Sequence, residues 1–134
     1  MRPSALPLTA VAALLMPSVA YVRTAQAASF EKWDQAAFDK AQAEGRPVLL
    51  YIEASWCPTC AKQTPTLSSL MDDKTFRDMA VFRVNFDTQK DVVRGFGATM
   101  QSTLIVFHGK TETGRAVGET KPEAIRALLA TALA

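Results

Sequence analysis

The chain has few of the residues that metal and phosphate sites require. Its 134 residues include two cysteines, one histidine and six glycines. A tetrahedral zinc site would lack cysteine and histidine ligands. Neither the glycine-rich phosphate loop of nucleotide-binding proteins nor the G-x-S-x-G turn of serine hydrolases is present. The sequence therefore gives no support to these enzyme classes.

The chain also lacks a large charge of one sign. It has 15 basic and 13 acidic residues, a net charge of +2. Arg2 and Arg23 account for this excess, because no acidic residue precedes Glu31. The remaining charges alternate in sign and form no basic stripe for nucleic acid, and there are no internal repeats or low-complexity tracts. We expect protein or small thiol partners, and no nucleic acid.

No hydrophobic run is long enough for a membrane span, which needs ~20 apolar residues. The apolar stretch Ala5–Ala20 is interrupted by prolines, follows a basic start and precedes Ala25-Gln26-Ala27, an A-x-A cleavage pattern. We predict a secretory signal peptide over residues 1–27 and one domain over 28–134. The mature protein would then be periplasmic, with no stable membrane insertion. An uncleaved anchor is the alternative.

The only two cysteines stand at C-x-x-C spacing, as Cys57 and Cys60. They follow Val48–Ile52, an apolar run typical of a buried strand. Two intervening residues allow both sulfur atoms to lie on the first turn of a helix, close enough to form a disulfide. Thiol/disulfide exchange is therefore the leading hypothesis. A structural disulfide or half of a metal site are the alternatives.

The first cysteine is the expected nucleophile. At a helix start its sulfur faces unpaired amide groups and the positive end of the helix dipole, which favour the thiolate. Cys57 would attack the substrate and Cys60 would resolve the mixed disulfide. Pro58 suits the first turn because its missing N–H leaves no helical bond unmade, and Thr59 is compatible with that position.

Hydrophobic spacing predicts an α/β fold with a mixed sheet flanked by helices. Strands separated by a helix favour parallel pairing, and strands separated by a turn favour a hairpin. The expected helices span residues 33–43, 57–71, 90–96 and 121–133, with a helical turn within 73–79; the expected strands span 48–53, 81–87, 103–107 and 115–118.

Residues around the cysteines resemble the active-site segment of the thioredoxin superfamily. Ala54-Ser55-Trp56 precedes the C-x-x-C pair, and Pro65 follows Cys60 by five residues. The strand-like Thr103–Phe107 and the later Gly109, Gly114 and Gly118 continue the match, which covers roughly Phe30 to the end. The stretch Glu44–Leu50 is similar to the C-terminal domains of bacterial thiol:disulfide interchange proteins, which conduct reductant across the membrane.

The resemblance implies a thioredoxin-like fold, a central mixed β-sheet flanked by helices. It also implies exchange with protein disulfides through a redox-active Cys57–Cys60 disulfide, with no metal and no other cofactor. Five residues near the cysteines are the expected substrate contacts: Trp56, Pro58, Thr59, Gln101 and Ser102. A membrane reductant conductor is a possible electron donor.

Two positions depart from the family pattern. Ser102 occupies the position of the usual cis-proline facing the cysteines, and a non-proline cis bond costs ~3 kcal/mol. Tyr51 stands where thioredoxins bury an aspartate. Glu53 lies two residues further along the same strand face, nearer the active-site turn. We therefore predict Glu53 as the proton acceptor for Cys60; an exposed strand-end glutamate is the alternative.

A metal carrier is the rival hypothesis. Cys57, Cys60 and Met100 would form a soft ligand set suited to Cu(I), and two chains could share an iron–sulfur or zinc site. His108 at a strand end is given no catalytic role. The preferred interpretation is a periplasmic thiol:disulfide oxidoreductase that acts reductively. The two residues between the cysteines, Pro58 and Thr59, match neither the pair usual in thioredoxins nor the pair usual in strong oxidants.

Overall fold

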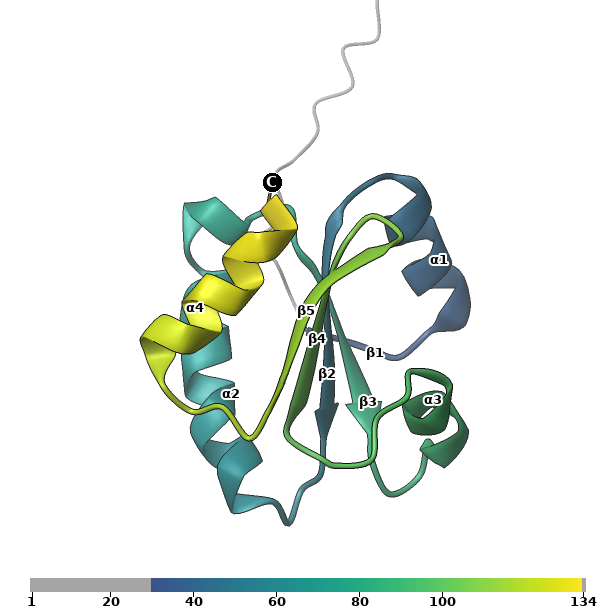
Figure 1. Cartoon of the computed structure of the whole chain (residues 1–134), viewed down its shortest axis with the longest axis vertical. Coiled ribbons are helices and arrows are strands. Elements are labelled where there is room, and N and C mark those ends of the chain that lie inside the picture. The colour runs from purple at the N-terminus through teal and green to yellow at the C-terminus, as the bar shows by residue number, and fades with distance from the viewer. Residues whose placement is uncertain (1–29, 134) are drawn as a thin grey trace, which may run out of the picture.

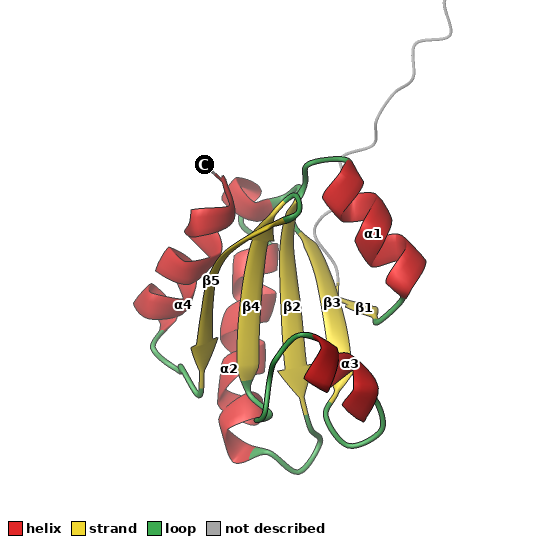
Figure 2. Ribbon diagram, turned by 45° about the vertical axis from the view of Figure 1, so that its right-hand side comes forward, coloured by secondary structure: helices red, strands yellow, loops and turns green. Residues whose placement is uncertain are grey.

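Five strands form one mixed sheet in the computed structural model, which describes residues 30–133 (Figure 1). The predicted signal peptide and the domain start at residue 28 lie outside the described residues. The strands run in the order β1-β3-β2-β4-β5 (Figure 2). Their bounds are β1 Phe30–Lys32, β2 Pro47–Glu53, β3 Ala80–Asn85, β4 Thr103–His108 and β5 Thr111–Val117.

The strand directions agree with the expected pairing. β2 pairs parallel with β3, which follows it through a helix, and β4 and β5 form an antiparallel hairpin. β2 also pairs antiparallel with β4, with Ile52 opposite Thr103. That register places the carboxyl end of β2 beside the segment that enters β4.

Helices cover both faces of the sheet (Figure 1), which confirms the expected α/β architecture. One face is covered by α2 and α4, and the other by α1 and α3. β2 lies at the centre and is buried along almost its whole length, because its side chains alternate between two cores. The helices are α1 Gln35–Ala43, α2 Pro58–Met71, α3 Lys90–Gly95 and α4 Pro122–Ala130, with 3₁₀ turns η1 Lys74–Phe76 and η2 Thr131–Leu133.

Several boundaries differ from the prediction for local reasons. α1 begins two residues later than expected, because the Asp34 carboxylate caps it by accepting the Ala37 N–H at 2.7 Å. Cys57 is likewise the N-cap of α2 and lies outside its helical residues. β5 begins at Thr111 instead of Arg115, and the sequence pattern did not predict β1.

The loops after β2 and β3 and the loop before β4 gather at one end of the sheet (Figure 1). This end holds the cysteines, since Cys57 and Cys60 follow directly after β2. No helix within residues 30–133 is long and apolar enough to cross a membrane.

Candidate active site

The two cysteines occupy the junction between β2 and α2. Cys57 has an extended backbone and caps α2, so its sulfur accepts the backbone N–H of Cys60 at 3.1 Å. Pro58 fills the first helical position, where no amide donor is needed. Both cysteines are free thiols and both are buried. The pair therefore has the local geometry expected for reversible disulfide formation.

The surroundings of Cys60 favour its protonated thiol. Burial is the main cause that raises the pKa of Cys60, and the hydrogen bond and charge of Cys57 add to it. Hydrogen bonding by the backbones of Ala54 and Ser102 opposes these effects and lowers the pKa of Cys60. Cys60 thus needs help to lose its proton, which suits a resolving cysteine that reacts only after Cys57. The two roles remain predictions from the sequence.

Tyr51, at the position where thioredoxins bury an aspartate, is hydrogen-bonded to the backbone of α2. Its hydroxyl donates to the Cys60 carbonyl at 3.1 Å and lies 3.2 Å from the Thr64 Oγ1, which donates to the same carbonyl at 3.0 Å. Burial raises the pKa of Tyr51 well above its usual range. A neutral phenol here holds the backbone of Cys60, and it cannot take up a proton as a carboxylate would.

Glu53 lies at the end of β2, two residues beyond Tyr51. Its carboxylate oxygen is 3.5 Å from the Arg83 Nε. The Arg83 guanidinium carbon also lies over the ring of Phe30, 4.6 Å from the ring centroid. The Glu53 charge contributes to the raised pKa of Tyr51, so both side chains share one face of β2. The Glu53 carboxylate thus forms an ion pair with Arg83. Proton transfer from Cys60 to Glu53 stays a prediction.

Trp56 is exposed beside the cysteines, with 57% of its surface accessible. Its indole N–H donates to the Asp87 carboxylate at 2.8 Å, which orients the ring. The turn around Asp87 is itself ordered, because the Asn85 side chain accepts the N–H groups of Asp87 and Thr88 at 2.9 and 3.0 Å. Sequence reasoning did not single out Asp87, since only the fold brings it to Trp56.

The segment before β4 contains the other predicted substrate contacts. No peptide bond among residues 30–133 is cis, so the bond before Ser102 is trans. Ser102 is buried and has a φ of 56°, in the left-handed region that a residue with a side chain rarely adopts. Gln101 is half-buried, and Met100 is 49% exposed. Of the two residues between the cysteines, Pro58 is exposed and Thr59 half-buried.

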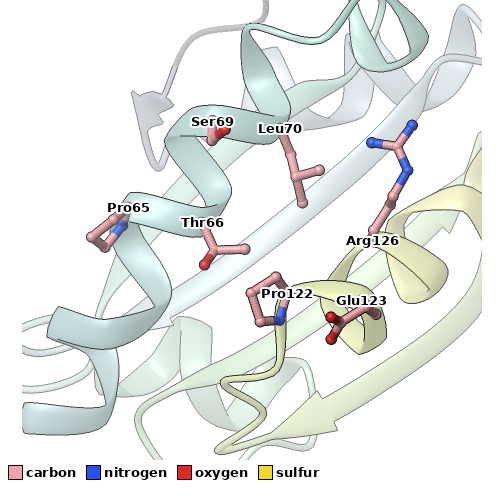
Figure 3. Close-up of a pocket in the computed structure, with 7 residues that line it drawn as sticks. All are labelled: Pro65, Thr66, Ser69, Leu70, Pro122, Glu123 and Arg126. Atoms are coloured by element: carbon pink, nitrogen blue, oxygen red, sulfur yellow. The ribbon is translucent and has the colours of Figure 1, made fainter.

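A groove of about 440 Å³ lies between α2 and α4 (Figure 3). It is lined by Pro65, Thr66, Ser69, Leu70, Pro122, Glu123 and Arg126. None of these is a cysteine or a predicted substrate contact, so the groove is separate from the exchange site. Within residues 30–133, no group of three or more histidine, cysteine, aspartate or glutamate residues is placed to hold a metal ion.

Comparisons with known proteins point to one family. The thioredoxin family model matches residues 29–131. A thioredoxin H-type from Fagopyrum esculentum is 31% identical over 93 residues, which span 69% of this chain and 78% of the relative.

Solved structures agree. Trxlp from Edwardsiella tarda EIB202 is 44% identical with a TM-score of 0.73, over 75% of this chain and 98% of that one. Thioredoxin from Trypanosoma brucei brucei has a TM-score of 0.69 at 17% identity, over 82% and 96% of the two chains, which is a likeness of fold. With the cysteine pair at the end of β2 and the family match over nearly all the described residues, the chain belongs to the thioredoxin family and is a thiol:disulfide oxidoreductase.

Proposed function

We propose that this chain is a periplasmic thioredoxin that reduces disulfides in other proteins. The supporting observation is the Cys57 sulfur at the start of α2, where it accepts the backbone N–H of Cys60 at 3.1 Å. Pro58 and Thr59 between the cysteines add no charge. Strong oxidants of this chemistry owe their potential to a stabilised reduced form. With no charged residue between the cysteines to stabilise the reduced form further, the proposed direction is the opposite one, electron donation to the client.

The reaction follows from the two thiols. The Cys57 thiolate attacks a client disulfide, a bond forms between Cys57 and one client sulfur, and the second client sulfur leaves as a thiolate. Cys60 then loses its proton and attacks Cys57. The Cys57–Cys60 disulfide forms and the client is released with two electrons and two protons gained. The redox centre is this disulfide, and the proposal includes no metal or other cofactor.

The client would be a protein. Thioredoxins act on protein thiols and disulfides, and two apolar side chains are exposed here: Trp56, directly before Cys57, and Met100, in the segment before β4. In an oxidising compartment the oxidised protein must be reduced again after each turnover. A membrane protein that conducts reductant is the proposed donor.

The reduction potential tests the direction. We expect the chain from Ala28 onward to equilibrate near about −270 mV in dithiothreitol or glutathione buffers, with Trp56 fluorescence as the reporter. A potential near about −120 mV would instead identify a disulfide donor. A Cys57→Ser, Cys60→Ser variant controls for fluorescence changes unrelated to the thiols.

The location rests on the first 27 residues and is tested separately. Full-length chain expressed in a Gram-negative host should appear in the periplasmic fraction with Ala28 as its first residue. Recovery from the cytoplasm with residues 1–27 intact would contradict export.

A further inference from the structure

Gln63 is a fully buried polar residue on the active-site helix. Its side-chain amide donates to two backbone carbonyls, that of Ser102 at 3.2 Å and that of Glu119 at 2.9 Å. Ser102 precedes β4 and Glu119 follows β5. One side chain therefore joins α2 to two loops that are distant in the sequence.

The three segments form a closed set of hydrogen bonds. The Ser102 carbonyl accepts a second donor, the Gly118 N–H at 2.9 Å, so it is held both by α2 and by the loop after β5. Ser102 needs this support because its φ of 56° is unfavourable for a residue with a side chain. Loss of the Gln63 bonds would leave the Ser102 carbonyl held by the Gly118 N–H alone, so the Ser102 backbone could relax more easily toward an ordinary conformation.

The backbone of Ser102 also acts on Cys60, the expected resolving cysteine. Ser102 retains the backbone N–H that a proline would lack, and hydrogen bonding by this backbone lowers the pKa of Cys60 against the effect of burial. The other titratable groups that face Cys60 are Cys57, the N-cap of α2, and Tyr51 on β2, with Glu53 beyond Tyr51. The backbones of Ala54, in the loop between β2 and α2, and Ser102, in the segment before β4, support the Cys60 thiolate from outside these two elements. Of the two, Ser102 is the one bound by Gln63, which lies three residues beyond Cys60 on the buried face of α2.

We propose that Gln63 is a positioning residue that holds Ser102 so that its backbone N–H faces the Cys60 sulfur and supports the thiolate that resolves the mixed disulfide. In that step Cys60 loses its proton, its sulfur bonds to Cys57, and the client sulfur departs as a thiolate. Gln63 contacts neither the client nor the reacting sulfur atoms. It acts through the Ser102 backbone.

The cost of burying Gln63 supports a role beyond packing. Its carbonyl oxygen Oε1 is buried and has no hydrogen-bond partner. An unsatisfied buried acceptor destabilises a fold, and an apolar side chain of similar size would avoid it. Leucine or methionine at this position would remove the unpaired oxygen, but would also take the Gln63 donor away from the Ser102 and Glu119 carbonyls. The amide donors of Gln63 are what such replacements would lose.

Alkylation of Cys60 as a function of pH tests the proposal. In a Cys57→Ser background, where Cys60 is the one remaining thiol, we expect Gln63→Leu to move the alkylation midpoint to higher pH. The alkylation rate at pH 7 should fall about three- to tenfold, because the thiolate fraction below the midpoint drops about tenfold when the midpoint rises by one pH unit. Gln63→Met provides a second apolar variant if Gln63→Leu does not fold.

Leu67→Met is the matched control, a buried change one turn further along α2 that keeps side-chain volume and makes no bond to either loop. It should leave the alkylation midpoint unchanged. In the chain with both cysteines, Gln63→Leu should slow release of the client from the mixed disulfide and leave the initial attack by Cys57 unaltered.

A Gln63→Leu protein with altered melting temperature but an unchanged Cys60 alkylation profile overturns the proposal. The inference rests on thiol exchange and is independent of its direction. Alkylation needs neither a client nor an electron donor, so its outcome is separate from the test of reductive function.

Discussion

At the scale of single residues, Tyr51 changes how the active-site turn is supported. An acid at this position could exchange protons with Cys60, whereas the Tyr51 hydroxyl is a neutral donor to the Cys60 carbonyl. Proton transfer must then use another group or water. Glu53 is the nearest acidic candidate along β2, and its carboxylate is paired with Arg83.

Removal of the Tyr51 hydroxyl should cost modest stability and change its dependence on alkaline pH. Tyr51→Phe loses one buried hydrogen bond, worth about 1 kcal/mol at pH 7. Because burial raises the pKa of Tyr51 in the folded state, its stabilising contribution is present below the unfolded pKa of about 10 and is lost as pH rises above it. Urea unfolding at pH 7 and pH 10.5 measures both effects.

The wild-type protein should lose more stability between these two pH values than Tyr51→Phe. Equal losses in the two proteins would show that Tyr51 titrates normally in the folded state. Thr64→Val is the companion control, because it removes the other donor to the Cys60 carbonyl without adding or removing a titratable group.

The sequence predicted the reactive pair because spacing alone brings Cys57 and Cys60 to one helical turn. Other contacts depend on segments that meet only in the folded chain. Asp87 reaches Trp56 from the end of β3, and Gln63 binds carbonyls 39 and 56 residues away. A buried glutamine within a helix has no sequence signal that distinguishes it from an exposed one. The positive φ of Ser102 is similarly set by its neighbours.

At the scale of secondary-structure elements, Arg126 connects α4 to the η1 turn. Its guanidinium donates to the Asp73 carboxylate at 2.8 Å and lies over the ring of Phe76, 5.2 Å from its centroid. Asp73 also caps η1 by accepting the Thr75 N–H at 2.8 Å. Backbone bonding by Thr75, followed by the contact with Arg126, lowers the pKa of Asp73 to about 2.

Asp73→Asn should weaken the acid sensitivity of folding. A carboxyl whose pKa is lowered in the folded state stabilises the protein above its unfolded pKa of about 4, and this contribution disappears as pH falls toward about 2. The melting temperature of the wild type should therefore decline more between pH 5 and pH 2.5 than that of Asp73→Asn. Parallel declines would contradict the contribution of Asp73. Asp72→Asn is a control one residue away.

Elements with strong periodicity were predicted to within a few residues. β2 and α2 are examples, because the apolar run of β2 and the residues that cap α2 can be recognised from neighbouring residues in the sequence. β1 was missed because Phe30–Lys32 is too short to show alternation. β5 was predicted to start late because Thr111–Gly114 is polar and half exposed, as an edge strand permits.

At the scale of the whole molecule, the sheet separates two cores with different chemistry. The core under α2 and α4 includes both cysteines and Tyr51. The core under α1 and α3 contains aromatic rings packed at centroid distances of 5.1–6.2 Å. These rings belong to Trp33, Phe38, Phe82, Phe96 and Phe107. Stability and redox chemistry should therefore be separable by mutation.

Phe38→Ala should destabilise the fold by about 3–5 kcal/mol, because Phe38 is buried at the centre of the aromatic core. The reduction potential of the folded fraction should stay the same. Leu67→Ala, on α2 in the other core, is the matched comparison and should both destabilise the protein and shift its potential. Urea unfolding and dithiothreitol equilibration measure the two quantities. A shifted potential in Phe38→Ala would show that the two cores are coupled across the sheet.

The two edges of the sheet bear on how the protein behaves when it is concentrated. Within residues 30–133, β1 offers three residues for pairing, and β5 carries the Arg115–Glu112 ion pair, at 2.6 Å, next to a register shift in its pairing with β4. Short strands, charges and irregular register all hinder the addition of a foreign strand. We therefore expect these edges to resist the strand pairing between chains that leads to β-sheet aggregates.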